Sequence, residues 1–403
     1  MDIKNILSRL ASNADDFFDE VRERITEHNG GYRPVYIQPY RGVGSDRELF
    51  LKGRVLVDRQ VETADDRDTV WNNLVSMYKR FNSREVPNVR VQARFGTYQQ
   101  VVTTDAEGYF EVRFHLDEPL PPWRMWYPVA LKLLDEVSSG QGTVQATGEV
   151  QVAHVESKFG VISDMDDTVL VTGATNLLKM ARLTFLNNAR TRLPFAGVAA
   201  FYRALQKGDD AATHPLYYVS SSPWNLYDLL LDFCRVHGIP EGPLLLRDYG
   251  LDAPEKSIER DASAEQVAEH QRDERRAGGH LDHKLAQIKL VMSTTDPLPF
   301  LLIGDSGQKD PEIYEEVVRR YPGRVKAIYI RDVSSAARDK EVHEIAGRVR
   351  AQGVDMLLVK DTVDAAHHAF ERGFIRAEAL EDIGLDAKID QEAPSDLEQI
   401  LKG

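Results

Sequence analysis

The sequence of 403 residues carries a formal net charge of −14, and 42% of its residues are hydrophobic. This length allows two or three domains with cores of their own, and the negative charge argues against a nucleic-acid-binding role. The single cysteine, Cys234, excludes an internal disulfide. No uncharged apolar stretch approaches the roughly 20 residues that a membrane span needs. We therefore expect a cytoplasmic protein whose membrane contact, if any, is peripheral on the inner face.

The first 30 residues predict an amphipathic helix. Their apolar side chains recur at near-helical spacing, and Gly30 and Gly31 follow. The polar face is rich in Asp and Glu rather than Lys, which favours packing against the next domain over membrane binding.

Between residues 31 and 155 the apolar spacing changes to that of strands, for example in Leu49–Val57 and Val89–Phe95. We expect a β-sandwich domain here. The turn Thr103–Val112, with Gly108, resembles the T-D-x-x-G-Y-F turn of transthyretin-like and carboxypeptidase-regulatory domains. We expect no chemistry within this domain.

Residues 156–375 predict an α/β domain, because short apolar runs alternate with helical segments. Most runs are almost continuously apolar, as parallel strands covered on both faces are. The fold class is therefore α/β, a doubly wound, Rossmann-like parallel sheet with its sites at the carboxyl ends of strands. Residues 376–403 indicate an acidic C-terminal tail. The strand candidates are 160–163, 216–220, 244–246, 300–304, 325–330 and 355–359.

The first of these strands ends in two carboxylates, Asp164 and Asp166. Such a pair is repulsive unless a cation lies between its members, and a divalent metal is the cation that carboxylate oxygens favour. The two could also divide the chemistry, with Asp164 as nucleophile and Asp166 as general acid and base. The alternative is a solvated, Asp-rich turn.

A second strand runs into Ser220, Ser221 and Ser222. Hydroxyl and backbone N–H groups before a helix can bind phosphate. Ser222 followed by Pro223 is equally typical of a helix N-cap.

A third strand, Phe300–Gly304, runs into Asp305, and Asp310 follows five residues later. Asp310 before a proline is also typical of a helix start. Asp305 has no such capping role, although Lys309 could pair with it.

Lys284 lies in a predicted helix, about 50° from the centre of its apolar stripe. A lysine in that position either extends its ammonium group to solvent or contacts a buried anion.

Taken in order, these four elements resemble the motif set of the haloacid dehalogenase (HAD) superfamily of phosphotransferases. The set is Asp-x-Asp-x-Thr, an apolar strand ending in Ser, a Lys, and Gly-Asp-x4-Asp. The resemblance covers about residues 155–365 and implies a HAD-like fold. The matching residues are Asp164–Thr168, Ser220, Lys284 and Gly304–Asp310.

The resemblance implies a role for each residue. Asp164 would attack phosphorus and form an aspartyl-phosphate, and Asp166 would protonate the leaving oxygen and then activate water. Lys284 would shield the charge between Asp164 and the phosphate. The residues implied to hold the phosphoryl group are Thr168, Ser220, Ser221 and Lys284.

The resemblance also implies bound Mg²⁺. Its ligands would be Asp164, the main-chain carbonyl of Asp166, and an acidic residue of the last motif, Asp305 or Asp310. Which of these last two contacts the metal stays open.

The exact residues in and around these motifs resemble, more specifically, those of the actin-patch-associated phosphatidate phosphatase family. The segments that carry this resemblance are Ser163–Val169, Tyr218–Trp224, His283-Lys284 and Gly304–Asp310. It implies a lipin-like, Mg²⁺-dependent catalytic domain that converts phosphatidic acid to diacylglycerol and phosphate. The alternatives are a HAD phosphatase for a soluble phosphomonoester or phosphoprotein, and an inactive binding protein that uses the β-sandwich.

A basic stretch follows the first motif, with no Asp or Glu between Thr168 and Asp209. Cations interleaved with apolar residues suit a phosphatidate headgroup at an anionic membrane surface. The alternative is a packed helix pair whose cations face the acidic remainder of the protein. The candidate headgroup contacts are Lys179, Arg182, Arg190 and Arg192.

Overall fold

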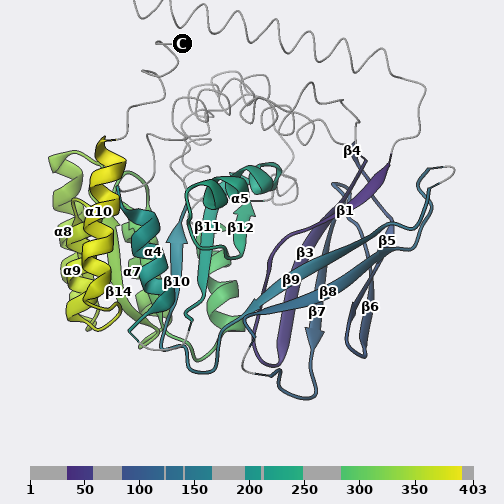
Figure 1. Ribbon diagram of the computed structural model, residues 1–403, viewed down its shortest axis with the longest axis horizontal. Coiled ribbons are helices and arrows are strands. Elements are labelled where there is room, and N and C mark those ends of the chain that lie inside the picture. Colours follow the sequence, from purple (N-terminus) through teal and green to yellow (C-terminus); the bar gives the residue numbers. More distant parts are fainter. Residues whose placement is uncertain are drawn as a thin grey trace, which may run out of the picture.

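The computed structural model contains two β-sheets, joined in sequence between Val152 and Gly160 (Figure 1). The helix expected in residues 1–30 lies outside the residues that the structure describes. No described helix is long and apolar enough to cross a membrane. The described residues are 34–57, 84–121, 124–138, 141–165, 196–209, 213–247 and 283–392.

The strand-rich region expected for residues 31–155 is present as a nine-stranded sheet. All its strand pairs are antiparallel except β2 with β9. Strands from both ends of the sheet, β3 and β7 at one and β5 at the other, contribute to one hydrophobic core, so the sheet curls around it. The strands are β1 (Val35–Pro39), β2 (Gly42–Gly44), β3 (Glu48–Val57), β4 (Arg84–Glu85), β5 (Arg90–Phe95), β6 (Tyr98–Thr103), β7 (Tyr109–His115), β8 (Trp126–Leu133) and β9 (Gln145–Val152).

The turn before β7 has the geometry that its sequence predicts. Asp105 Oδ1 accepts the backbone N–H groups of Glu107 and Tyr109, at 2.9 and 2.8 Å. Gly108 has a φ of 79°, a region that side chains with a Cβ rarely adopt. This turn therefore depends on an aspartate and a glycine for its shape.

The second sheet is parallel and six-stranded, in the order β12-β11-β10-β13-β14-β15. The strands run as continuous buried segments, which is the pattern that the sequence predicted for a sheet covered on both faces. Their bounds are β10 (Gly160–Asp164), β11 (Leu216–Pro223), β12 (Leu244–Arg247), β13 (Phe300–Asp305), β14 (Val325–Arg331) and β15 (Asp355–Val359).

Helices cover both faces of this sheet. Successive strand residues point to opposite faces, and on each face they belong to a separate hydrophobic core that also contains helix residues. Val161 packs in one core and Ile162 in the other. The first core holds residues of α4 (Val198–Lys207), α5 (Tyr227–Val236), α9 (Thr362–Glu371) and α10 (Glu378–Glu392). The second holds residues of the helical segment 283–294, α7 (Asp310–Arg320) and α8 (Ala336–Arg350).

Part of the segment expected as an acidic tail is helix α10, which packs beside α4 and α9. Ile383 is buried in the first core, Ala379 and Leu380 pack against that core, and Ala387 is also buried. The apolar residues of this acidic helix therefore extend the α/β region to Glu392.

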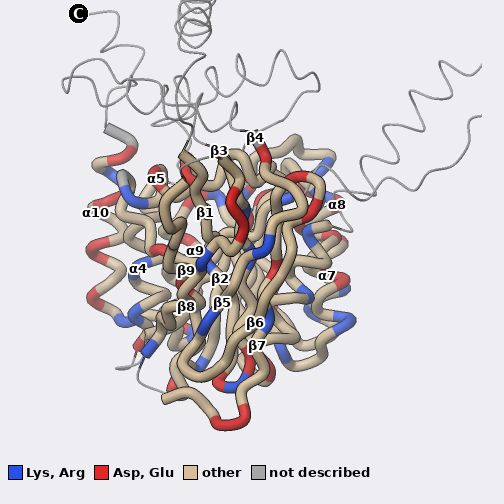
Figure 2. Tube along the Cα trace, turned by 90° about the vertical axis from the view of Figure 1, so that its right-hand side faces the viewer, with Lys and Arg blue, Asp and Glu red and all other residues tan. Residues whose placement is uncertain are grey.

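Charges of both signs are interspersed along α7 and α8 (Figure 2). Arg348 of α8 bonds Glu315 of α7 through two nitrogens, at 2.6 and 2.9 Å. These exposed charges thus pair with one another across neighbouring helices.

The two sheets meet through aromatic and charged contacts. The rings of Tyr40 and Trp224 stack with 4.3 Å between their centroids. Arg54 donates to Asn225 Oδ1 at 2.7 Å, and Val43 is buried in the second core of the α/β region. The strand-rich region therefore packs directly on the segment that follows β11.

Candidate metal and phosphate site

The candidate site lies where three neighbouring parallel strands end. Asp164 is the last residue of β10, and its Cα pairs in register with Val219 of β11. On the other side β10 pairs with β13, which ends at Asp305. Ser220 follows Val219, so Asp164, Ser220 and Asp305 lie at one edge of the sheet. Alignment of parallel strand ends is what brings residues so far apart in sequence together.

Lys284 reaches this edge from the helical segment 283–294. Its Nζ lies 2.8 Å from Asp164 Oδ1 and 2.9 Å from Asp310 Oδ1, and it donates to Gln308 Oε1 at 3.2 Å. Burial of Leu285 and Ile288 fixes the helix against the sheet. The side chain of Lys284 is only 4% exposed, so its ammonium group contacts buried anions rather than solvent.

Asp310 directs its carboxylate into the site and does not cap helix α7. The N-cap position is Lys309, and no side chain caps the helix. Besides contacting Lys284, Asp310 accepts the backbone N–H of Asp305 through Oδ2 at 3.1 Å. Lys309 pairs with Glu312 at 3.3 Å on the exposed surface, rather than with Asp305.

Gly304 makes room for the Asp310 carboxylate. A Cβ at position 304 would lie 2.4 Å from Asp310 Oδ2, far inside van der Waals contact. The glycine that the last motif includes therefore has a steric reason in this chain.

Asp305 organises the loop that follows β13. Its Oδ1 accepts the backbone N–H groups of Gly307 and Gln308, at 2.8 and 3.0 Å. One carboxylate oxygen from each of Asp164, Asp305 and Asp310 can be chosen so that all three lie within 4.8 Å of one another. Three carboxylate oxygens so close are a ligand set suited to a hard divalent cation.

Among the described residues, charged groups of both signs gather at the site. The three carboxylates are buried, and the ammonium group of Lys284 contacts two of them. Arg331, whose Cα pairs with Asp305 in the neighbouring strand, adds one further positive charge nearby. The three described carboxylates repel one another, and their burial makes this charge costly. A bound metal ion fits this arrangement.

Ser220 and Ser221 are both buried at the end of β11. The backbone N–H of Ser222 donates to Ser220 Oγ at 3.0 Å. The alternative role of Ser222 as a helix cap is not observed, because the short helix η1 (Trp224–Leu226) has Pro223 at its N-cap and no side-chain cap.

Several sequence-predicted site residues lie outside the described part of the chain. Lys284, Asp305 and Asp310 are described and lie together with Asp164, whereas the second carboxylate, the threonine and the basic stretch of the first motif are not described. These residues are Asp166, Thr168, Lys179, Arg182, Arg190 and Arg192.

Two further residues support the site, and the sequence patterns gave no sign of them. Arg338 of α8 donates to the main-chain oxygens of Ser306 and Gln308, at 3.1 and 3.0 Å, and bonds both carboxylate oxygens of Glu312. This raises the pKa of Arg338 above its usual value, chiefly through the hydrogen bonds to Glu312. Arg338 thus fixes the loop after Asp305. In sequence it is one cation among many on a charged helix.

The second is Tyr202, whose hydroxyl lies 2.6 Å from Ser163 Oγ. Ser163 in turn donates to the main-chain oxygen of Asp164 at 2.9 Å. Burial raises the pKa of Tyr202 to about 12, and the nearby Asp164 also raises it. The phenol therefore stays protonated at neutral pH and donates toward the end of β10.

The fold and site define a mixed α/β protein with a strand-rich N-terminal region and a cluster of three aspartates and a lysine at the carboxyl edge of its parallel sheet. Residues 159–332 match the family model described as the catalytic domain of phosphatidate phosphatase APP1. The matched segment contains every described residue of the candidate site.

Two curated proteins are similar to this chain in sequence. Phosphatidate phosphatase APP1 of Saccharomyces cerevisiae is 25% identical over 300 residues, which are 70% of this chain and 46% of the yeast protein. An uncharacterized protein of Schizosaccharomyces pombe is 28% identical over 239 residues, 58% of this chain and 34% of that protein. The chain thus spans less than half of either relative.

Solved structures resemble this chain only distantly. A β-glucuronidase of Parabacteroides merdae aligns with a TM-score of 0.24 and 11% identity, over 74% of this chain and 33% of that chain. A Ca²⁺-stabilized adhesin of an Antarctic bacterium aligns with a TM-score of 0.17 and 12% identity, over 31% and 25%. Neither informs the fold or the function.

Proposed function

We propose that residues 156–375 form a HAD-like phosphatase domain that hydrolyses phosphatidic acid to diacylglycerol and phosphate. The observation that carries the proposal is the contact of Lys284 Nζ with both Asp164 and Asp310, at 2.8 and 2.9 Å, beside the third carboxylate, Asp305. The similarity to yeast phosphatidate phosphatase APP1 supports the same substrate class.

The proposed cofactor is Mg²⁺, which would supply charge neutralisation and orientation of the phosphoryl oxygens. Its ligands would come from Asp164, the main-chain carbonyl of Asp166 and Asp305 or Asp310. Of the last two, we favour Asp305 as the direct ligand. Both oxygens of Asp310 already accept hydrogen bonds, one from Lys284 and one from the backbone of Asp305. Asp310 would then orient Lys284 and the loop.

In the proposed reaction, Asp164 attacks phosphorus in line with the departing diacylglycerol oxygen and forms an aspartyl-phosphate. Asp166 donates a proton to that oxygen and then takes one from the water that hydrolyses the intermediate. Lys284, with Ser220, Ser221 and Thr168, holds the phosphoryl oxygens. Because Lys284 also contacts Asp164, its ammonium group lowers the repulsion between the carboxylate and the anionic phosphate.

The membrane side of the proposal rests on the basic stretch after Thr168. Lys179, Arg182, Arg190 and Arg192 would contact the headgroup and an anionic membrane surface, with the protein bound peripherally at the cytoplasmic face. For the strand-rich region we propose a transthyretin-like sandwich that supports the catalytic domain.

The test measures phosphate release from phosphatidic acid in mixed micelles and from soluble phosphomonoesters, each with Mg²⁺ and with EDTA. We expect Mg²⁺-dependent release that is fastest with phosphatidic acid and that rises with its surface concentration in the micelle. Equal rates for soluble esters, with no dependence on the lipid surface, would exclude the lipid substrate and leave a soluble-ester phosphatase. No release from any ester would exclude a phosphatase.

A further inference from the structure

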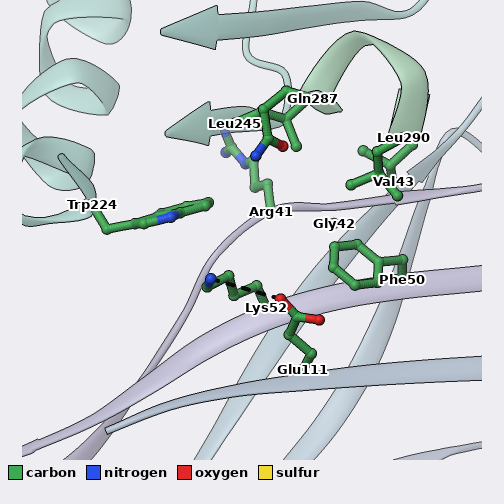
Figure 3. A pocket seen from close by; sticks show the side chains of 10 residues that line it. All are labelled: Arg41, Gly42, Val43, Phe50, Lys52, Glu111, Trp224, Leu245, Gln287 and Leu290. Carbon is green, nitrogen blue, oxygen red and sulfur yellow. Dashed lines mark ion pairs between the residues drawn. The ribbon is translucent and has the colours of Figure 1, made fainter. Parts of the chain in front are cut away.

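A pocket lies between the two sheets (Figure 3), and none of the three aspartates of the candidate site lines it. Arg41, Lys52 and Glu111 line it from the strand-rich region, and Trp224 and Gln287 line it from the α/β region. Its cavity of about 80 Å³ has room for a small polyatomic ion but not for a lipid chain. The remaining walls are Gly42, Val43, Phe50, Leu245 and Leu290.

Two donors on residues that line the pocket have no acceptor among the described residues. Trp224 is 5% exposed, and its indole Nε1 is buried without a hydrogen-bond partner. The same is true of Arg41 Nη1, whereas Nη2 of that guanidinium pairs with Glu241. A buried donor without an acceptor is costly, so two of them on residues that line one cavity indicate an acceptor that the described residues do not supply.

Two cations line this pocket, and each has a carboxylate partner, Glu241 for Arg41 and Glu111 for Lys52. Side-chain exposure is only 12% for Arg41 and 11% for Lys52. Burial lowers the pKa of Arg41 from its usual value. The carboxylate among the lining residues, Glu111, is 60% exposed and lies 3.7 Å from Lys52 Nζ, so it can remain on the solvent side when an anion enters.

We propose that this pocket binds a small oxyanion, such as inorganic phosphate or a carboxylate, which accepts hydrogen bonds from Trp224 Nε1 and Arg41 Nη1 and is neutralised by Lys52. The apolar walls exclude water and strengthen these charge-assisted bonds. This site is separate from the proposed catalytic site and does not depend on the proposed phosphatase activity.

Two of the residues that line the pocket lie close in sequence to residues of the candidate site. Trp224 follows directly on β11, whose end carries Ser220, and Gln287 lies one helical turn beyond Lys284. A bound oxyanion would bridge both elements to the strand-rich region and hold the two sheets together.

The experiment is equilibrium dialysis of radiolabelled inorganic phosphate against the full chain in EDTA, so that metal-dependent binding is suppressed. We expect one bound phosphate per chain in the wild type. Trp224→Phe keeps the ring that stacks on Tyr40 but removes the N–H, and should weaken binding about tenfold. Lys52→Gln should weaken it at least as much, whereas Lys132→Gln, on an exposed strand position, should not change it.

Competition with acetate distinguishes the two oxyanion sources. Displacement at similar concentrations indicates a carboxylate site, and displacement only at large excess indicates a phosphate site. The proposal is wrong if neither anion binds, or if Ser220→Ala abolishes binding while Trp224→Phe and Lys52→Gln leave it unchanged. Thermal unfolding verifies that each variant is folded. Trp224→Phe alone decides the question if Lys52→Gln is unstable.

Discussion

Two turns in this molecule use an aspartate in the same way, one in each region. Asp105 in the strand-rich region and Asp305 in the α/β region each accept two backbone N–H groups through Oδ1, from residues two to four positions further along. Their local geometry is similar, and each has a glycine nearby, Gly108 and Gly307. Asp105 shapes a surface turn, whereas Asp305 lies within reach of two more buried carboxylates.

The difference comes from what the neighbouring strands contribute. In the antiparallel region, alternate strand ends point in opposite directions, so a turn meets mostly its own hairpin. In the parallel sheet, the carboxyl ends of β10, β11 and β13 converge on one edge. A similar turn therefore forms a candidate metal site only where neighbouring strands place other carboxylates beside it. We therefore expect substitutions in the two regions to change different observables.

The largest effect on activity should come from Asp164→Asn. The amide is a poor nucleophile, so we expect phosphate release from phosphatidic acid to fall by about a thousandfold or more. Because the variant removes one of several buried negative charges, it should fold. The matched control is Asp105→Asn, whose amide oxygen can still accept both N–H groups and which should retain full activity. Turnover that survives in Asp164→Asn would show that Asp164 is not the nucleophile.

Gly304→Ala should have the next largest effect. The added Cβ would lie 2.4 Å from Asp310 Oδ2, so the carboxylate must move and carry Lys284 with it. We expect a loss of about a hundredfold in kcat, as displacements of about 1 Å in an active site produce.

The control for this variant is Gly347→Ala, at an exposed position of α8 where nothing lies within 4 Å of the new Cβ. It should leave activity unchanged and stabilise the protein by about 0.5–1 kcal/mol, since alanine is the better helix former. Normal kcat in Gly304→Ala would mean that the position of Asp310 is not critical.

A smaller loss is expected for Arg338→Gln, which removes the bonds that fix the loop after Asp305. Arg338 is a positioning residue, so the apparent Mg²⁺ affinity should fall by about tenfold while saturating Mg²⁺ restores most of kcat. Arg348→Gln is the control, because it removes a two-nitrogen bond to a glutamate from the same helix but at a distance from the loop. Equal Mg²⁺ dependence in both variants would contradict the assigned role.

The site residues at strand ends could be predicted from the sequence. The contacts of site residues that lie on neighbouring helices could not. Asp164, Ser220 and Asp305 follow apolar strands, and parallel strands that neighbour one another place their ends together. The sequence allows two positions for the ammonium group of Lys284, in solvent or against a buried anion. Helical periodicity shows on which side of the helix a side chain lies, but not which groups it contacts. Only the neighbouring sheet decides that its ammonium contacts two carboxylates.

The remaining features depend on tertiary contacts that no local pattern encodes. Arg338 donates hydrogen bonds to main-chain oxygens some 30 positions earlier. Because every residue has a main-chain oxygen, the sequence does not indicate which of them Arg338 contacts. The acidic composition of residues 376–403 predicts a tail, but Ile383 of helix α10 is buried in the first core, and Asp386 and Asp390 accept backbone N–H groups at the start of α4. The sequence around Asp310 is typical both of a helix cap and of a buried carboxylate. The structure shows the buried carboxylate, which accepts from Lys284 and from the backbone of Asp305.

The smallest effect on activity is expected for Gly108→Ala in the strand-rich turn. The residue has a φ of 79°, and its new Cβ would lie 2.7 Å from the main-chain oxygen of Val55. Gly96→Ala is the control, since its φ of 55° imposes a similar backbone strain but nothing lies within 4 Å. Gly96→Ala should cost about 1 kcal/mol of unfolding free energy, and Gly108→Ala should cost more, because a backbone atom must also move. Denaturant unfolding measures both, and phosphate release per folded molecule should stay within about twofold of the wild type. Arg54 links this turn to the α/β region, since it bonds both Glu107 and Asn225. A fall in kcat with little loss of stability would therefore mean that this arginine transmits the shape of the turn to the end of β11, and the strand-rich region would then be part of the catalytic unit rather than a support for it.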